Sequence, residues 1–148
     1  MGFLTTLSIF ILTIAVLYGL NKLYFYFLRK SAAKLVTQEE FQENMRGAQI
    51  IDVREKEDFN RGHVLGARSV PYTISKTHKE YLTAIRKDKD IYLYDNKQTL
   101  AIYMARLLKK EGYTNIYILK EGYSGWTGKT KLKDKKGSLS NRTDESDI

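Results

Sequence analysis

Asp95 is the residue that the sequence places best for chemistry. It directly follows the apolar run Ile91–Tyr94, which is typical of a buried strand, and it precedes a loop and then a helical pattern. In α/β proteins, ligands and reactive side chains gather beyond the carboxyl end of a strand. The carboxyl group at this junction has three candidate roles: a nucleophile, a helix cap, or the replacement of a different reactive residue.

Asp52 and Arg54 form a second polar pair at the end of a predicted strand, residues 48–53. A ligand site is one interpretation of this position. An ion pair that fixes the following loop is the favoured one, because such pairs also occur where there is no chemistry. His63 has no other ligand at metal-binding spacing, so we expect no metal site and a histidine packed under the neighbouring glycine turns.

The chain contains no cysteine, which excludes disulfides, thiolate metal ligands and persulfide chemistry on its own side chains. Its formal net charge is +8, but much of that charge lies in the lysine-rich segment 129–136. No motif combines basic and aromatic residues as nucleic-acid readers do, so we expect no nucleic-acid partner. We identify no cofactor motif and expect no cofactor.

An Asp-based phosphatase is the enzymatic alternative. The segment 91–99 superficially resembles the strand and aspartate of haloacid-dehalogenase-like phosphatases, in which a second aspartate follows two residues later. That position holds Lys97 here. A lone aspartate after a strand is a weak signal, so we favour a structural role. Its carboxylate suits the first turn of the helix, and Asp95→Ala is then expected to cost about 1 kcal/mol of stability.

An uncharged apolar run, residues 3–20, opens the chain. At about 1.5 Å per residue it nearly crosses a hydrocarbon core, which takes roughly 20 residues. The aromatic segment 23–28 suits the membrane interface, and Arg29 and Lys30 follow it. No charged side chain precedes the run, which favours an anchor over a cleaved signal peptide. The positive-inside rule then places the N-terminus outside and the rest in the cytoplasm. An externally facing domain is the alternative.

Beyond the anchor, short β-branched runs alternate with helical patterns. A capping box at Thr37 predicts a helix start, strands are expected at 48–53, 91–94 and 115–119, and a helix at 75–87. This alternation predicts an α/β domain with a mostly parallel sheet that is covered on both faces. The helix after Asp95 has the clearest stripe of apolar residues, at Leu100, Tyr103, Met104, Leu107 and Leu108.

Three blocks of this domain resemble the rhodanese-like domain family. "IIDVREKEDFNRGHVLGARSVPY" (50–72) is similar to its Asp-x-Arg, Gly-His-x-x-Gly-Ala and Pro signature. The strand, loop and helix at 91–110 follow, and "GYTNIYILKEGYSGW" (112–126) resembles its closing strand and turn. The resemblance implies a three-layer domain. The matching positions are Asp52, Arg54, Gly62, His63, Gly66, Ala67, Pro71, Gly122 and Trp126.

The resemblance also implies what has been lost. In active members a cysteine heads the loop and carries sulfur as a persulfide, a basic residue follows five positions later, and a hydroxyl comes next. Asp95, Leu100 and Ala101 occupy those positions here. We therefore expect a degenerate active-site loop without catalytic residues. It consists of Asp95, Asn96, Lys97, Gln98, Thr99, Leu100 and Ala101.

These observations predict a single-pass membrane protein with three parts: a transmembrane anchor with its basic flank (1–30), a rhodanese-like domain (35–127) and a disordered charged tail (128–148). The expected function is that of a sulfurtransferase-like pseudoenzyme, an interaction or scaffold module that faces the cytoplasm. Its expected partners are the lipid bilayer, through residues 3–28, and an unidentified protein. Residual sulfurtransferase-related or Asp-based activity at the loop is the alternative.

Overall fold

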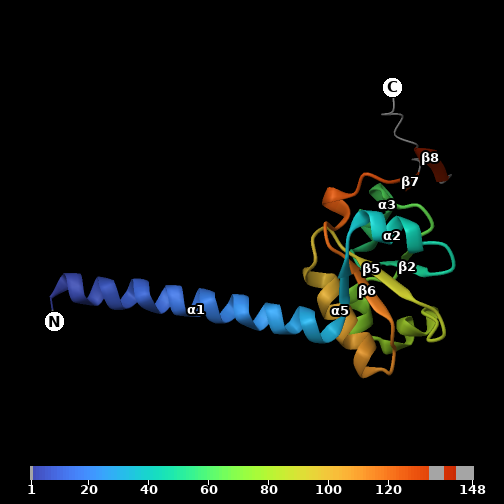
Figure 1. Ribbon diagram of the computed structural model, residues 1–148. Helices are drawn as coiled ribbons and strands as arrows, with labels where there is room; N and C mark the ends of the chain where they lie inside the picture. Colours follow the sequence, from blue (N-terminus) through green and yellow to red (C-terminus); the bar gives the residue numbers. More distant parts are fainter. Residues whose placement is uncertain (1, 134–138, 143–148) are drawn as a thin grey trace. The chain divides into compact units, whose positions relative to one another are not determined.

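The computed structural model describes residues 2–133 and 139–142 and divides the chain into two compact units. The first unit ends at Ser31 and contains all but the last residue of one helix, α1 (Phe3–Ala32) (Figure 1). The 25 residues Phe3–Phe27 are long and apolar enough to cross a membrane, and none of the most apolar window is buried. The structure thus contains the long apolar helix that the sequence predicts.

The second unit is built on a fully parallel sheet of five strands in the order β1-β6-β5-β2-β4. A smaller antiparallel sheet has the order β3-β7-β8. The first sheet contains β1 (Lys34–Val36), β2 (Gln49–Asp52), β4 (Arg68–Ser69), β5 (Ile91–Tyr94) and β6 (Ile116–Leu119), and the second contains β3 (His63–Val64), β7 (Thr130–Lys133) and β8 (Leu139–Arg142).

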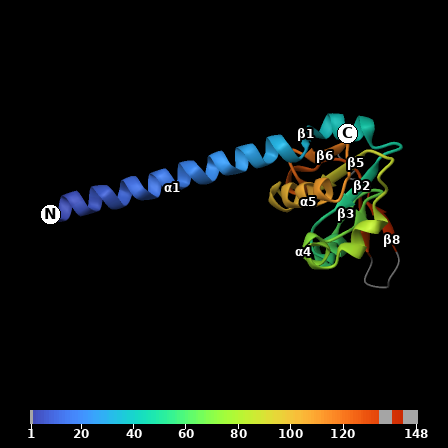
Figure 2. The ribbon, with the colours of Figure 1, turned by 90° about the horizontal axis from the view of Figure 1, so that it is seen from below.

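Helices cover the parallel sheet on both faces, and Figures 1 and 2 show α2 and α5 on opposite sides of it. On the side of α2, the ring of Phe41 meets Tyr92 edge-on with 5.1 Å between ring centroids. The predicted α/β architecture with three layers is confirmed. Its helices are α2 (Gln38–Asn44), α3 (Lys56–Arg61), α4 (Tyr72–Thr77) and α5 (Thr99–Lys110), with 3₁₀ turns η1 (Lys79–Ala84) and η2 (Tyr123–Gly125).

Local sequence explains how these elements begin. The side chain of Thr37 accepts the N–H of Glu40 at 3.4 Å and caps α2, as the capping box predicts. All four residues of β2 and all four of β5 are buried. Strands that are buried along their whole length are typical of a parallel sheet covered on both faces.

The buried face of helix α5 coincides with the predicted stripe only in part. Ala101 and Ala105 are fully buried, whereas Leu100, Tyr103 and Leu107 are only half-buried. The small alanine side chains let the helix backbone approach the sheet closely, and the larger side chains lie at the edges of the contact. Met104 and Leu108 of the predicted stripe are also fully buried. Periodicity therefore located the helix and part of its buried face, but it did not include the two alanines.

The predicted helix at 75–87 is wrong in its continuity. The structure has α4 and η1 instead, and His78 lies between them with a non-helical backbone, φ −121° and ψ +85°. Leu82 and Ile85 are the buried apolar residues of this stretch. Most helical stability in proteins comes from packing of an apolar face. Two buried apolar residues near one end of the stretch do not form such a face along its whole length.

The predicted disordered tail, 128–148, differs from the structure where the structure describes it. Strand β7 pairs with β3, with Val64 opposite Thr130, and β8 pairs with β7. Backbone hydrogen bonds to the domain order this polar segment, which composition alone does not reveal. The rest of the predicted tail, 134–138 and 143–148, lies outside the described residues.

Candidate functional site

The ends of β2 and β5 bring the polar residues of the candidate site together. These strands are neighbours in the parallel sheet, with Asp52 directly opposite Tyr94. The residues that follow, Arg54 and Asp95, therefore leave the sheet at the same edge. This is the edge at which α/β proteins usually bind ligands.

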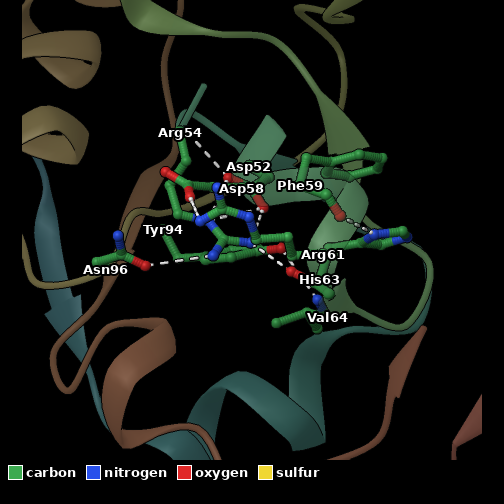
Figure 3. A network of polar contacts seen from close by, with 10 residues as sticks. Asp52, Arg54, Asp58, Phe59, Arg61, His63, Val64, Tyr94 and Asn96 are labelled. Carbon is green, nitrogen blue, oxygen red and sulfur yellow. Dashed lines mark hydrogen bonds and ion pairs between the residues drawn. The ribbon is translucent and has the colours of Figure 1, made fainter. Parts of the chain in front are cut away.

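Asp52 and Arg54 form a buried ion pair, as favoured from the sequence (Figure 3). The Arg54 Nη2 atom lies 2.7 Å from Asp52 Oδ2, and Nε lies 3.0 and 3.1 Å from the two carboxylate oxygens. The backbone N–H of Arg54 also donates to Asp52 Oδ1 at 2.9 Å. Removing one partner of such a pair costs about 3–5 kcal/mol, because the other charge stays buried.

Arg54 also connects three other segments of the domain. Its guanidinium donates to the Gly62 carbonyl at 2.7 Å and to Asn96 Oδ1 at 3.2 Å, and it lies over the Tyr123 ring, 4.1 Å from the centroid. Burial lowers the pKa of Arg54, but the hydrogen bond and the charge of Asp52 outweigh it and the net pKa is raised. Arg54 is thus a permanent cation that positions the loop through Asn96.

Tyr94 is a site residue that the sequence did not single out. Its hydroxyl accepts the backbone N–H of Val64 at 3.0 Å, and its side chain is fully buried. Burial and the nearby charge of Asp52 raise the pKa of this phenol far above its ordinary value. Tyr94 stays neutral and ties β5 to β3. Its position as the last residue of a predicted buried strand, directly before Asp95, is the signal that could have found it.

The degenerate loop rests on the turn before η2. The Asp95 carbonyl accepts the N–H of Tyr123 at 2.8 Å, and the Asn96 carbonyl accepts that of Ser124 at 3.2 Å. Gly122 has φ +67°, and a Cβ atom there would overlap the backbone of Asn96. Three loop residues are exposed: Asn96, Lys97 and Thr99. The backbone of the loop is fixed by its hydrogen bonds to the turn before η2.

The Asp95 side chain points into this loop and is 4% exposed. Its Oδ2 atom accepts the N–H of Leu100 at 3.0 Å, whereas Oδ1 has no partner among the described residues. The expected contact of the carboxyl group with the loop is therefore present, but with one donor only. Burial raises the pKa of Asp95, the Leu100 N–H opposes that rise, and the charge of Asp52 adds to it.

This environment does not suit a nucleophile. A nucleophilic carboxylate must be ionised and must reach a substrate, but burial disfavours the charged form of Asp95 and covers the group. Lys97, which stands where a phosphatase needs a second aspartate, is exposed on the loop. Among the described residues, no cluster of three histidine or carboxylate side chains is placed to hold a metal ion.

Most of the remaining motif residues lie in the segment 62–71, which contacts the ion pair through the Gly62 carbonyl. The His63 ring stacks on Phe59 with 3.7 Å between centroids, and its Nδ1 atom lies 2.8 Å from the Phe59 carbonyl oxygen. Gly62 supplies the carbonyl that Arg54 binds, Gly66 and Ala67 follow β3, and buried Pro71 precedes α4. These residues determine the course of the segment 62–71. Among the described contacts, none joins them to the Asp95 side chain.

Trp126 contributes to packing away from the ion pair. Its ring meets Phe41 at a centroid distance of 5.5 Å, and its indole N–H donates to the Lys129 carbonyl at 3.3 Å. The structure therefore gathers Asp52, Arg54, Gly62 and Asn96 into one network with Tyr94 and Tyr123, and it keeps Trp126 on the α2 side of the sheet.

Comparison with known proteins gives a consistent result. The family described as rhodanese-like domain matches residues 37–129. The uncharacterized protein YqhL of Bacillus subtilis is 43% identical over 108 residues, which are 73% of this chain and 83% of that protein. The uncharacterized protein YibN of Escherichia coli K12 is 29% identical over 100 residues, 66% of this chain and 70% of that protein.

Solved structures show the same fold at lower sequence identity. The rhodanese-like domain of Alr3790 from Anabaena superposes with a TM-score of 0.59 at 23% identity, covering 66% of this chain and 78% of that one. A rhodanese-like domain protein from Staphylococcus aureus gives 0.57 at 18% identity, with 74% and 99% covered. The fold resemblance implied by the sequence motifs is thus confirmed.

Proposed function

The chain belongs to the rhodanese-like domain family, and from this premise we propose that it is a non-catalytic interaction module, anchored in a membrane, whose folded domain faces the cytoplasm. One observation carries the proposal. The loop that holds the sulfur-carrying cysteine in active members holds Asp95 here, and the chain has no cysteine at all. No sulfurtransferase catalytic residue is therefore present.

The geometry of the loop supports a structural role for the replacement. The carboxyl group of Asp95 is turned inward to the Leu100 N–H instead of outward to a substrate. The network of Asp52 and Arg54 still holds the loop through Asn96. A domain that keeps its folded loop but lacks its reactive sulfur is suited to binding, not to sulfur transfer.

The membrane and cytoplasmic parts of the proposal have separate support. Helix α1 has the length and composition of a membrane span, and Arg29 and Lys30 follow its apolar part. Basic residues next to a span are retained on the cytoplasmic side, which favours a cytoplasmic domain.

Sulfur transfer is the direct test. The full chain in detergent micelles should transfer no sulfur from thiosulfate to cyanide above the level of an Asp95→Ser variant. Asp95→Cys supplies the missing thiol sulfur. A persulfide on that variant, detected by mass spectrometry, would report that the loop still accepts sulfur. Sulfur transfer by the unmodified chain would contradict the proposal.

Interaction is tested in membranes. Crosslinking of the full chain followed by mass spectrometry should recover a specific protein, and the same protein should be recovered with Asp95→Ser. A partner that is lost together with the carboxyl group would assign a direct binding role to Asp95 and oppose its purely structural one.

A further inference from the structure

A basic groove runs between α4 and α5, outside the degenerate loop. It has a volume of about 250 Å³ and is formed by side chains from both helices. None of its lining residues belongs to the loop 95–101. The lining residues are Tyr72, Lys76, Tyr103, Arg106, Leu107 and Lys110.

The groove combines an aromatic surface with positive charge. The rings of Tyr72 and Tyr103 stack with 5.8 Å between centroids and 23° between planes, and Leu107 continues the apolar surface. Lys76 and Arg106 add positive charge beside these rings. None of the described residues that line the groove is acidic, so the charge of this lining is of one sign.

Helix stability explains only part of this pattern. Lys76 and Lys110 lie in the last turns of α4 and α5, where cations interact favourably with the helix dipole. Arg106 lies one turn earlier, and the dipole does not account for a stacked tyrosine pair beside it. Neither Lys76 nor Lys110 forms an ion pair with another described residue.

We propose that this groove binds an acidic segment of a partner protein. Carboxylates of the segment would meet Lys76, Arg106 and Lys110, and an apolar or aromatic side chain of the segment would lie on the tyrosine pair. Aromatic residues and arginine are enriched where proteins bind each other, and complementary charge fixes the choice of partner. The inference rests on the proposed function, because it names the surface and the chemistry of the interaction.

The test uses the full chain in nanodiscs of zwitterionic lipid. The probe is a fluorescein-labelled peptide in which glutamates flank a Phe–Leu pair, and the control peptide has glutamine in place of glutamate. Fluorescence anisotropy should show binding of the acidic peptide, weakened at high salt, and little binding of the control peptide.

Two variants with the same change in net charge locate the site. Lys76→Gln/Arg106→Gln/Lys110→Gln should weaken binding by about tenfold or more. Lys56→Gln/Lys89→Gln/Lys120→Gln, at exposed positions outside the groove, should change it by less than about twofold. Thermal unfolding checks that both variants are folded. If the groove triple variant does not fold, Arg106→Gln alone replaces it. This single variant should weaken binding about threefold.

Three outcomes would overturn the inference. The first is no binding by the wild-type chain, or equal loss in both triple variants. The second is tighter binding after removal of residues 143–148, which would assign the groove to the chain's own acidic end. The third is displacement of the peptide by phosphatidylserine in the nanodisc, which would assign it to lipid. None of these outcomes alters the sulfur-transfer result, so the two proposals fail separately.

Discussion

At the scale of single residues, Asp95 differs from the other buried carboxylate of the site. Asp52 meets a guanidinium at 2.7 Å and a backbone N–H at 2.9 Å. Asp95 has one N–H donor, at 3.0 Å, and a second oxygen without a described partner. A buried carboxyl group with so few donors favours its neutral form. This difference predicts an unusual dependence of stability on pH.

Asp95→Asn isolates this effect, since it keeps an oxygen acceptor for the Leu100 N–H and removes the charge. Burial raises the pKa of folded Asp95 above the unfolded value of about 3.9. Between those two values the folded chain holds a proton that the unfolded chain has lost, so stability falls as pH rises. The unfolding free energy of the wild type, minus that of Asp95→Asn, should therefore fall from about pH 4 upward and level off above the folded pKa.

Denaturant unfolding of the full chain in micelles, followed by the fluorescence of its single tryptophan, Trp126, measures this difference. Asp88→Asn is the control. The hydrogen bond from Arg86 lowers the pKa of exposed Asp88, so the corresponding difference should not fall with pH. A difference for Asp95→Asn that stays constant or rises from pH 4 to pH 8 would contradict the prediction.

At the scale of elements, the loop after β5 and the turn before η2 fold as one unit. Two backbone hydrogen bonds join them, from Tyr123 to Asp95 and from Ser124 to Asn96. Gln98 adds a side-chain bond to the Lys120 carbonyl at 2.5 Å. The loop keeps its shape through these contacts and through Arg54, without the residues of an active sulfurtransferase. Gly122 allows the backbones of the loop and the turn to approach each other closely, because it has no Cβ atom.

Gly122→Ala should disrupt this unit, and Gly66→Ala is its matched control. Both glycines have positive φ, +67° and +86°, but only a Cβ at Gly122 overlaps neighbouring backbone. Gly66→Ala should cost about 1–2 kcal/mol for the left-handed backbone alone. Gly122→Ala should add about 1–3 kcal/mol of steric overlap. Chemical denaturation of both variants provides the comparison, and equal losses would show that the backbones are not in close contact.

At the scale of the whole molecule, a helix of membrane-spanning length is joined to a parallel α/β domain, and each forms its own compact unit. Under the proposed function, anchoring of α1 would concentrate the domain at a membrane surface and raise the local concentration at which the groove meets a partner on the same membrane. The orientation of the domain decides which partners it can meet.

The absence of cysteine allows a direct test of that orientation. Lys89→Cys introduces a thiol at an exposed position of the domain, and Gly2→Cys introduces one before the apolar helix. A membrane-impermeant maleimide should label Gly2→Cys in intact cells and Lys89→Cys only after permeabilisation, because a basic flank favours the cytoplasmic side of a membrane. The reverse pattern would place the domain outside.

The sequence predicted the parts of the fold that depend on local patterns. The strand Ile91–Tyr94 matches β5, the capping box matches the start of α2, and the motif blocks identified the family. Non-local contacts explain what it missed. β1 is three residues long and is held by pairing with β6, and β7 is a polar strand held by β3. Neither has an apolar pattern that sequence reading could detect.

The sequence by itself excluded persulfide chemistry on this chain, because a persulfide forms on a cysteine thiol and the chain has no cysteine. Only the tertiary structure decided how deeply Asp95 is buried and which other segments Arg54 connects. The burial of Asp95, the connection of Arg54 to Asn96 and Tyr123, and the meeting of α4 with α5 at the basic groove join residues far apart in the chain. Such contacts depend on packing, which one-dimensional periodicity does not encode.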